Sequence, residues 1–207
     1  MLQNINKELL LYLNWLTKYD TIKIIVWFFA DTPIFFLPIF LISLWIYYTY
    51  KKNTIITTKT KWIKNLVEKE NLLYIFYSVI IWITISLWIQ QIVNIERPEE
   101  AIKWVWLLLL DHIPDASFPS DHATVAVAFL TSLFYWWFKK TWLYFLPFVI
   151  IMILSRIIVW VHWPMDIIAW SFVWFFSSYI TYKYITKIKI IHKINKFIIK
   201  TMWYIKL

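Results

Sequence analysis

Cysteine and glycine are both absent from this 207-residue chain. Without cysteine, disulfides, thiolate metal sites and cysteine nucleophiles are excluded. Charged residues are also scarce, at 16%, whereas soluble globular domains carry roughly 25%. Hydrophobic residues make up 61% and aromatic residues 22%. This composition is typical of an integral membrane protein, and the length predicts a single domain over residues 1–207.

The missing glycine coincides with a surplus of tryptophan. A chain of this length ordinarily holds about 14 glycines, at a usage of roughly 7%, but this one holds none and has 16 tryptophans. We hypothesise that the gene uses a code in which UGA means glycine and was translated with UGA as tryptophan. Genuine tryptophan richness is the alternative, but it leaves the missing glycine unexplained. UGG codons at most of the 16 positions would contradict the hypothesis.

Arginine is the third scarce residue. Of the 21 basic residues, only Arg97 and Arg156 are arginine. Two arginines in a chain that otherwise uses lysine indicate positions where a planar, bidentate fork is needed, as in anion binding. The alternative is a chance distribution among the basic residues.

Five apolar segments approach the roughly 20 residues needed to cross a bilayer. They are residues 33–50, 71–94, 122–137, 143–161 and 164–184. Residues 8–29 are apolar too, but Lys18, Asp20 and Lys23 interrupt them. They predict an interfacial helix within an N-terminal segment 1–30, with a sixth span as the alternative, and residues 101–110 are expected to dip into the interface. The predicted fold is all-α, an integral membrane bundle of five to six transmembrane helices.

Charge predicts the orientation of these spans. Lysines gather in residues 51–70, at 139–140 and from 183 onward, whereas residues 94–121 carry six acids against two bases. By the positive-inside rule the lysine-rich segments are cytoplasmic, and the acidic loop and the 161–166 turn lie outside. We therefore expect a multi-pass protein of the cell membrane. Residues 185–207 form a basic cytoplasmic tail that is expected to lie on membrane lipids, not to bind nucleic acid.

Polar residues capable of chemistry lie near the outer ends of three predicted spans. They are Arg97-Pro98, Pro119-Ser120-Asp121-His122, Ser155-Arg156, His162 and Asp166. Ionisable groups at this depth are costly and indicate function. On a helical turn, Asp166 could hold the ring of His162, which would make an oriented nucleophile or base. Two arginines and a serine hydroxyl suit a tetrahedral oxyanion, and His122 suits a general acid.

These residues fall into a known pattern. Arg97-Pro98, Pro119-Ser120-x-His122 and Ser155-Arg156-x5-His162-x3-Asp166 resemble the three signature motifs of the type 2 phosphatidic acid phosphatase superfamily. The third motif fixes four residues over 12 positions, and the resemblance extends over roughly residues 20–180. Residues 115–123, DASFPSDHA, resemble the undecaprenyl-diphosphatase branch of that superfamily.

The resemblance implies a role for each of these residues. His162 would attack the terminal phosphorus and become phosphohistidine, and Asp166 would hold its ring. His122 would protonate the leaving oxygen and then activate water. Arg97, Ser120 and Arg156 would bind the phosphoryl oxygens, without a metal or other cofactor.

Undecaprenyl diphosphate, an isoprenoid lipid phosphate, is the substrate that the resemblance favours. One alternative is a broader phosphatase acting on phosphatidic acid or phosphatidylglycerol phosphate. The other is a non-catalytic protein that binds or translocates lipids.

The chain departs from the family pattern at several positions. Gln90 stands where the family often has lysine, so a phosphate contact is missing or comes from elsewhere, such as Lys103. Asp121 stands where glycine is frequent, and it could contact substrate or cap the span that follows. Trp160 and Trp170 occupy places where the family has small residues, and Trp142 and Trp174 occupy similar ones. These positions favour the glycine hypothesis.

Overall fold

The computed structural model describes residues 2–50, 58–93, 95–102, 117–136 and 138–204. This part of the chain is helical and contains no strand, which confirms the predicted all-α fold. The helices are α1 (Leu2–Asn14), η1 (Trp15–Lys18), α2 (Asp20–Asp31), α3 (Pro33–Tyr50), α4 (Thr58–Ile92), α5 (Pro98–Ala101), α6 (Asp121–Tyr135), α7 (Lys139–Ile158), α8 (Pro164–Tyr184), η2 (Ile185–Lys187) and α9 (Lys189–Tyr204).

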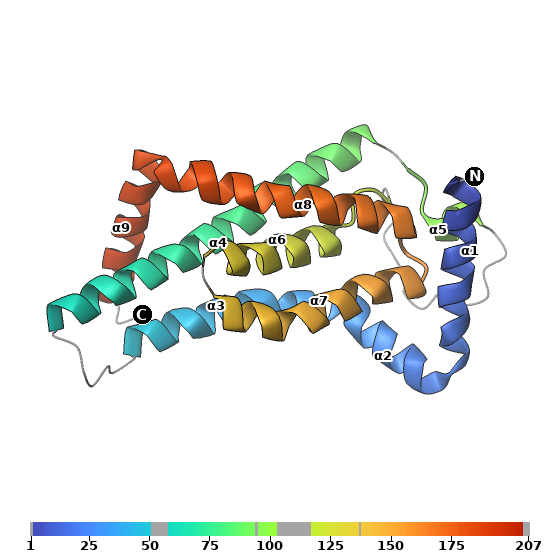
Figure 1. Ribbon diagram of the computed structural model, residues 1–207, viewed down its shortest axis with the longest axis horizontal. Helices are drawn as coiled ribbons and strands as arrows, with labels where there is room; N and C mark the ends of the chain where they lie inside the picture. Colours follow the sequence, from blue (N-terminus) through green and yellow to red (C-terminus); the bar gives the residue numbers. More distant parts are fainter. Residues whose placement is uncertain (1, 51–57, 94, 103–116, 137, 205–207) are drawn as a thin grey trace.

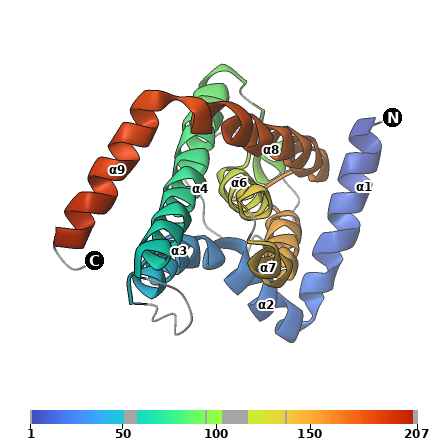
Figure 2. The same cartoon turned by 60° about the vertical axis from the view of Figure 1, so that its left-hand side comes forward.

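Helix α6 is the centre of the bundle. It packs against α4, α7 and α8, and Figure 2 shows it enclosed by them. Eleven of its 15 residues are buried, in one run from Ala123 to Leu133. Alanines in this run allow the neighbouring backbones to approach closely. Because protein surrounds α6, this helix meets little lipid, and its shortness is compatible with a place in the bundle.

The predicted spans correspond to five helices of the structure. Helices α3 and α8 have the predicted bounds, and each begins with a proline, a residue favoured in the first turn. Helix α4 begins at Thr58 instead of residue 71, because the lysine- and glutamate-rich stretch before the membrane also forms helix. Within the described part of the chain, Pro33–Tyr50, Asn65–Ile92 and Lys139–Ile158 are long and apolar enough to cross a membrane.

The N-terminal segment differs in detail from the single interfacial helix expected over residues 8–29. It is divided by η1 into α1 and α2, of 13 and 12 residues, each shorter than a bilayer span. Figure 1 shows α1 running across one end of the bundle and α9 across the other. The side-chain amide of Asn14 donates to the carbonyl of Ile158 at 2.8 Å, which fastens α1 to α7.

The described part of the C-terminal tail ends in an amphipathic helix, α9. Helix α9 packs against α4, where Asn195 is fully buried and accepts a hydrogen bond from the Tyr77 hydroxyl at 2.8 Å. His192 of α9 pairs with Glu70 of α4. Of the segment 101–110, which was expected to dip into the interface, residues 103–110 lie outside the described part.

Candidate active site

One end of the bundle gathers most of the residues singled out from the sequence. The amino ends of α5, α6 and α8 lie there with the carboxyl end of α7 (Figure 1). Arg97, Ser120, Arg156 and His162 each expose at most 2% of their surface. Buried charges require partners, and the contacts of these side chains define the site.

The His162 ring is held in one tautomer by its two neighbours. Its Nδ1 lies 2.7 Å from the carbonyl oxygen of Ser117, which can only accept, so Nδ1 carries the proton. Its Nε2 lies 3.3 Å from Nη2 of Arg156, which can only donate, so Nε2 keeps its lone pair. Burial lowers the pKa of His162 well below its usual range, and the charges of Arg156 and Arg97 lower it further. The site therefore holds a neutral imidazole whose Nε2 keeps its lone pair.

The direct contact expected between His162 and Asp166 is not formed. Asp166 Oδ2 instead accepts a hydrogen bond from the Ser117 hydroxyl at 2.8 Å. Helix α8 begins at Pro164, and Trp163 before it is extended (φ −72°, ψ 141°), so residues 162–166 do not make a helical turn. Ser117 thus links the two, its carbonyl to the ring and its hydroxyl to the carboxylate. Sequence reasoning missed Ser117, although it lies in the DASFPSDHA stretch.

Both arginines support the turn that carries His162. Arg97 is the N-cap residue of α5, with Pro98 in the first turn, and its Nη1 donates to the carbonyl of Val161 at 2.9 Å. Arg156 lies in the last turn of α7 and, besides contacting His162, forms an ion pair with Asp31. The two guanidinium groups therefore approach the turn from different elements, and Arg156 faces Nε2 of His162.

Asp31, the last residue of α2, was missed by sequence reasoning. Its Oδ1 lies 3.1 Å from Nε2 of His122 as well as contacting Arg156. Asp31 lies between the N-terminal segment 1–30, interpreted as interfacial, and the span predicted from residue 33, so neither assignment gave it a role. The sequence did contain one indication of its importance, because Asp31 is the only acidic residue between positions 21 and 67.

The segment before α6 is held by α4. Ser120 caps α6 by accepting from the Ala123 amide at 3.4 Å, so the capping role considered for Asp121 belongs to Ser120. Asp121 Oδ1 accepts from Nε2 of Gln90 at 2.9 Å, and Gln90 also donates to the carbonyl of Pro119 at 2.7 Å. Gln90, where the family often has lysine, thus fixes this segment. Lys103, the other candidate for a phosphate contact, lies outside the described residues.

Three tryptophans fit their positions poorly. Trp160, two residues from His162, has φ 74°, a left-handed conformation that favours glycine. Trp170 and Trp174 are stacked in the interior with ring centroids 5.0 Å apart. None of the three indole N–H groups finds a hydrogen-bond partner among the described residues. The conformation at 160 and the unsatisfied donors support the hypothesis that glycine belongs at these positions.

Comparison with known proteins gives one match. A sequence model of the PAP2 superfamily matches residues 71–190, more than half of the chain. The matched segment contains Arg97, His122, Arg156 and His162 but not Asp31. Neither a curated protein nor a solved structure matches the chain significantly.

Proposed function

Because the chain belongs to the PAP2 superfamily, whose members are phosphatases acting on lipid phosphates, we propose that it hydrolyses the phosphate of a membrane lipid through a phosphohistidine. The membrane character of the protein follows from the same family and from the three apolar helices found in the described part of the chain. The observation that carries the proposal is His162, buried and neutral, with the lone pair of Nε2 directed at the Arg156 guanidinium.

In the first step, Nε2 of His162 attacks the terminal phosphorus of the substrate. A phosphorus–nitrogen bond forms as the phosphorus–oxygen bond to the lipid breaks, and His122 gives its proton to the departing oxygen. In the second step, His122 takes a proton from water, which attacks the phosphohistidine. Inorganic phosphate leaves and His162 regains its lone pair.

The phosphoryl group would bind between the two guanidinium groups and the amino end of α6. Arg97 and Arg156 supply charge-assisted hydrogen bonds to its oxygens, and the Ser120 hydroxyl can donate while its oxygen caps the helix. The helix amino end favours an anion as well. Asp166 would act through Ser117, which holds the nucleophile's ring, and Asp121 would act through its contact with Gln90 or directly on substrate.

We propose undecaprenyl diphosphate as the substrate, with the site facing outside. The support is the likeness of residues 115–123 to that branch and the position of the site at the bundle end opposite the lysine-bearing helix α9. A phosphatase for phosphatidic acid or phosphatidylglycerol phosphate is the alternative within the enzyme class. A non-catalytic lipid-binding or lipid-translocating protein would not need a tautomerically fixed imidazole beside a second one.

The test is phosphate release by the full chain in detergent with a metal chelator present. The substrates are undecaprenyl diphosphate, phosphatidic acid and phosphatidylglycerol phosphate. We expect His162→Ala to abolish release and His122→Ala to lower it by roughly 10²–10⁴-fold. His192→Ala, a partly exposed histidine of α9, is the control and should change nothing.

The outcomes separate the alternatives. If phosphate is released from only one of the other two lipids, that lipid is the substrate in place of undecaprenyl diphosphate. Loss of release with chelator would contradict the metal-free mechanism. If none of the lipids is hydrolysed by folded protein, with or without the tryptophans replaced by glycine, the non-catalytic alternative holds.

A further inference from the structure

Asp31 connects the N-terminal helices to the two histidines, although it lies outside the segment matched by the family. It ends α2, and Oδ1 contacts both His122 at 3.1 Å and Arg156. Arg156 in turn contacts His162. The Asp31 carboxylate therefore connects His122, the proposed proton donor, through Arg156 to His162, the proposed nucleophile.

A carboxylate oxygen can only accept, so Nε2 of His122 carries a proton toward Asp31. This hydrogen bond fixes the rotation of the ring and leaves Nδ1 as the nitrogen that exchanges a proton with the substrate. When His122 carries both protons, before it serves as an acid, the carboxylate also balances its positive charge. The ion pair with Arg156 holds the Asp31 carboxylate in place.

We propose that Asp31 is a positioning residue that orients His122 and stabilises its protonated form, an inference that rests on the proposed function. The side chain of Asp31 is 43% exposed and that of His122 is 21% exposed, so neither is buried as a core contact. A purely structural role would require neither the exposure nor the position beside Arg156.

The test compares Asp31→Asn with Asp31→Glu and with Asp20→Asn, an exposed acid at the other end of α2. We expect Asp31→Asn to lower kcat on phosphatidic acid, whose departing alkoxide needs a proton, by roughly 10- to 100-fold, the loss typical when the carboxylate partner of a metal-bound histidine is removed. Asp31→Glu should recover part of the loss, and Asp20→Asn should resemble the parent chain. With nitrophenyl phosphate, whose leaving group needs little protonation, the loss should be smaller.

Two further readouts distinguish positioning from general damage. In a His122→Asn background, Asp31→Asn should add little, because the two residues act as a unit. Additive losses, equal losses on both substrates, or an effect on KM alone would overturn the proposal. The ring nitrogen chemical shifts of His122 at fixed pH should change in Asp31→Ala while those of His192 do not. This measurement decides the contact even if no substrate is hydrolysed, in which case the proposed function fails separately.

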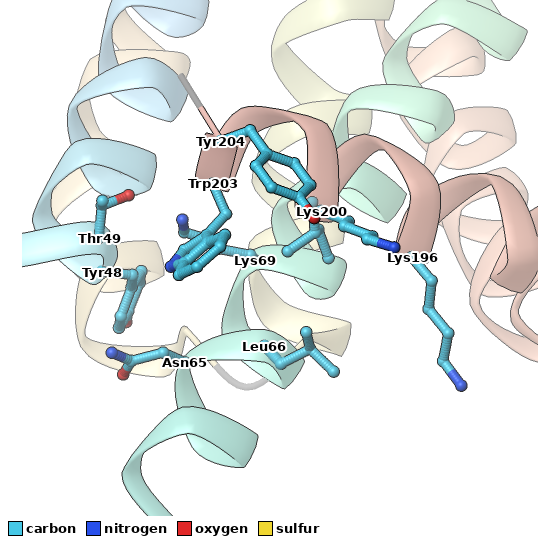
Figure 3. Close-up of a pocket in the computed structure, with 10 residues that line it drawn as sticks. Tyr48, Thr49, Asn65, Leu66, Lys69, Lys196, Lys200, Trp203 and Tyr204 are labelled. Atoms are coloured by element: carbon cyan, nitrogen blue, oxygen red, sulfur yellow. The ribbon is translucent and has the colours of Figure 1, made fainter. Parts of the chain in front are cut away.

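A second, independent observation lies at the opposite end of the bundle. Helices α3, α4 and α9 enclose a cavity of about 820 Å³, and Figure 3 shows Trp203 of α9 reaching toward Tyr48 of α3 and Lys69 of α4. Lys196 and Lys200 also line it, and no carboxylate does so among the described residues. The cavity thus combines three ammonium groups with aromatic walls.

The depth of this cavity matches a membrane interface. Lys69 lines the cavity and Gln90 contacts the segment before α6, and both belong to α4. They are 21 residues apart, which is about 32 Å along a helix and close to the roughly 30 Å of a bilayer core. Lys69 is only 6% exposed, and its ammonium lies 4.8 Å from the Trp45 ring. Charge and aromatic rings at this level suit a phospholipid headgroup.

We infer that this cavity binds the headgroup of an anionic phospholipid in the leaflet opposite the candidate active site. The test measures the affinity of the full chain for phosphatidylglycerol in nanodiscs of phosphatidylcholine, using retention of the lipid by native mass spectrometry. Lys196→Gln with Lys200→Gln removes two cavity lysines. Lys189→Gln with Lys193→Gln removes two exposed lysines of the same helix that do not line it.

The cavity pair should weaken binding roughly 30-fold, and the control pair much less. Trp203→Ala should weaken it as well, and inorganic phosphate should not compete, because it lacks the apolar part that the walls contact. If both lysine pairs lower the affinity for phosphatidylglycerol equally, the lipid is attracted by the whole basic surface, and the proposed binding site is refuted. Equal retention of phosphatidylglycerol and phosphatidylcholine, or displacement by phosphate, would overturn it too.

Discussion

The backbone at position 160 gives a prediction whose sign is unusual. Replacing Trp160 by glycine or by alanine removes the same indole and leaves nearly the same cavity, so the two variants differ mainly in their backbone. A non-glycine residue in the left-handed region is disfavoured by about 1–2 kcal/mol. Comparison with the parent chain is less decisive, because emptying a tryptophan site costs about 3–5 kcal/mol, which can mask the relief of strain.

Trp170, in the interior of α8, is the matched control site. There the backbone is helical, so alanine should be more stable than glycine by about 1 kcal/mol. Glycine loses more conformational entropy on folding than alanine does at either site. This term cancels when the two glycine–alanine differences are subtracted. The difference that remains in the free energy of unfolding should be about 1–2 kcal/mol in favour of glycine at 160.

The assay is unfolding in mixed micelles by titration with SDS, followed by circular dichroism. The four variants are Trp160→Gly, Trp160→Ala, Trp170→Gly and Trp170→Ala. If the alanine variant is more stable than the glycine variant by the same free energy of unfolding at 160 as at 170, the left-handed conformation does not limit stability and the reasoning is refuted. A UGG codon at 160 would separately contradict the reading of that position as glycine.

Three further predictions follow from the site. Replacing Trp160, Trp170 and Trp174 together by glycine should raise the rate of phosphate release, and equal activity would count against the glycine hypothesis. Attack requires unprotonated His162, whose pKa is lowered by burial and by Arg156 and Arg97, so the acid-side fall of kcat/KM should lie below about pH 6.5, the ordinary histidine value. In the unfolded chain, His162 has its ordinary pKa and is protonated at a higher pH than in the folded chain. The free energy of unfolding should therefore also decline as pH falls through about 6.5, and it should decline less in His162→Asn. Ser117→Ala should lower the free energy of unfolding by about 1–3 kcal/mol, because the Asp166 carboxylate loses one of its hydrogen-bond donors. The His162 ring keeps its contact with the backbone carbonyl of residue 117, so kcat should change less than in His162→Ala.

Local patterns in the sequence predicted the fold better than they predicted contacts. The bounds of α3 and α8 were predicted because proline marks each start and the apolar runs have span length. The start of α4 was missed because its first turns are polar, and hydropathy does not register a helix that extends beyond the membrane. The contact between His162 and Asp166 failed for a conformational reason, since the helix that would align them begins between them.

Contacts between distant segments had little signal in the sequence. Asp31 meets Arg156 across 125 positions, and nothing in the spacing of either residue indicates the other. Ser117 acts partly through its backbone carbonyl, a group that every residue has. The motif residues were identifiable because their chemistry is rare inside a membrane span. The residues that hold them in place were not.

The ion pair between Asp31 and Arg156 also sets an order of events during biosynthesis. Arg156 is the 125th residue added after Asp31, which at roughly 5–20 residues per second takes the ribosome about 6–25 s. Throughout that interval the Asp31 carboxylate lacks the Arg156 guanidinium, because that residue has not yet been added. The contacts between α2 and α7 cannot form before then, and the site cannot be assembled. A nascent chain therefore lacks this ion pair until Arg156 has been added.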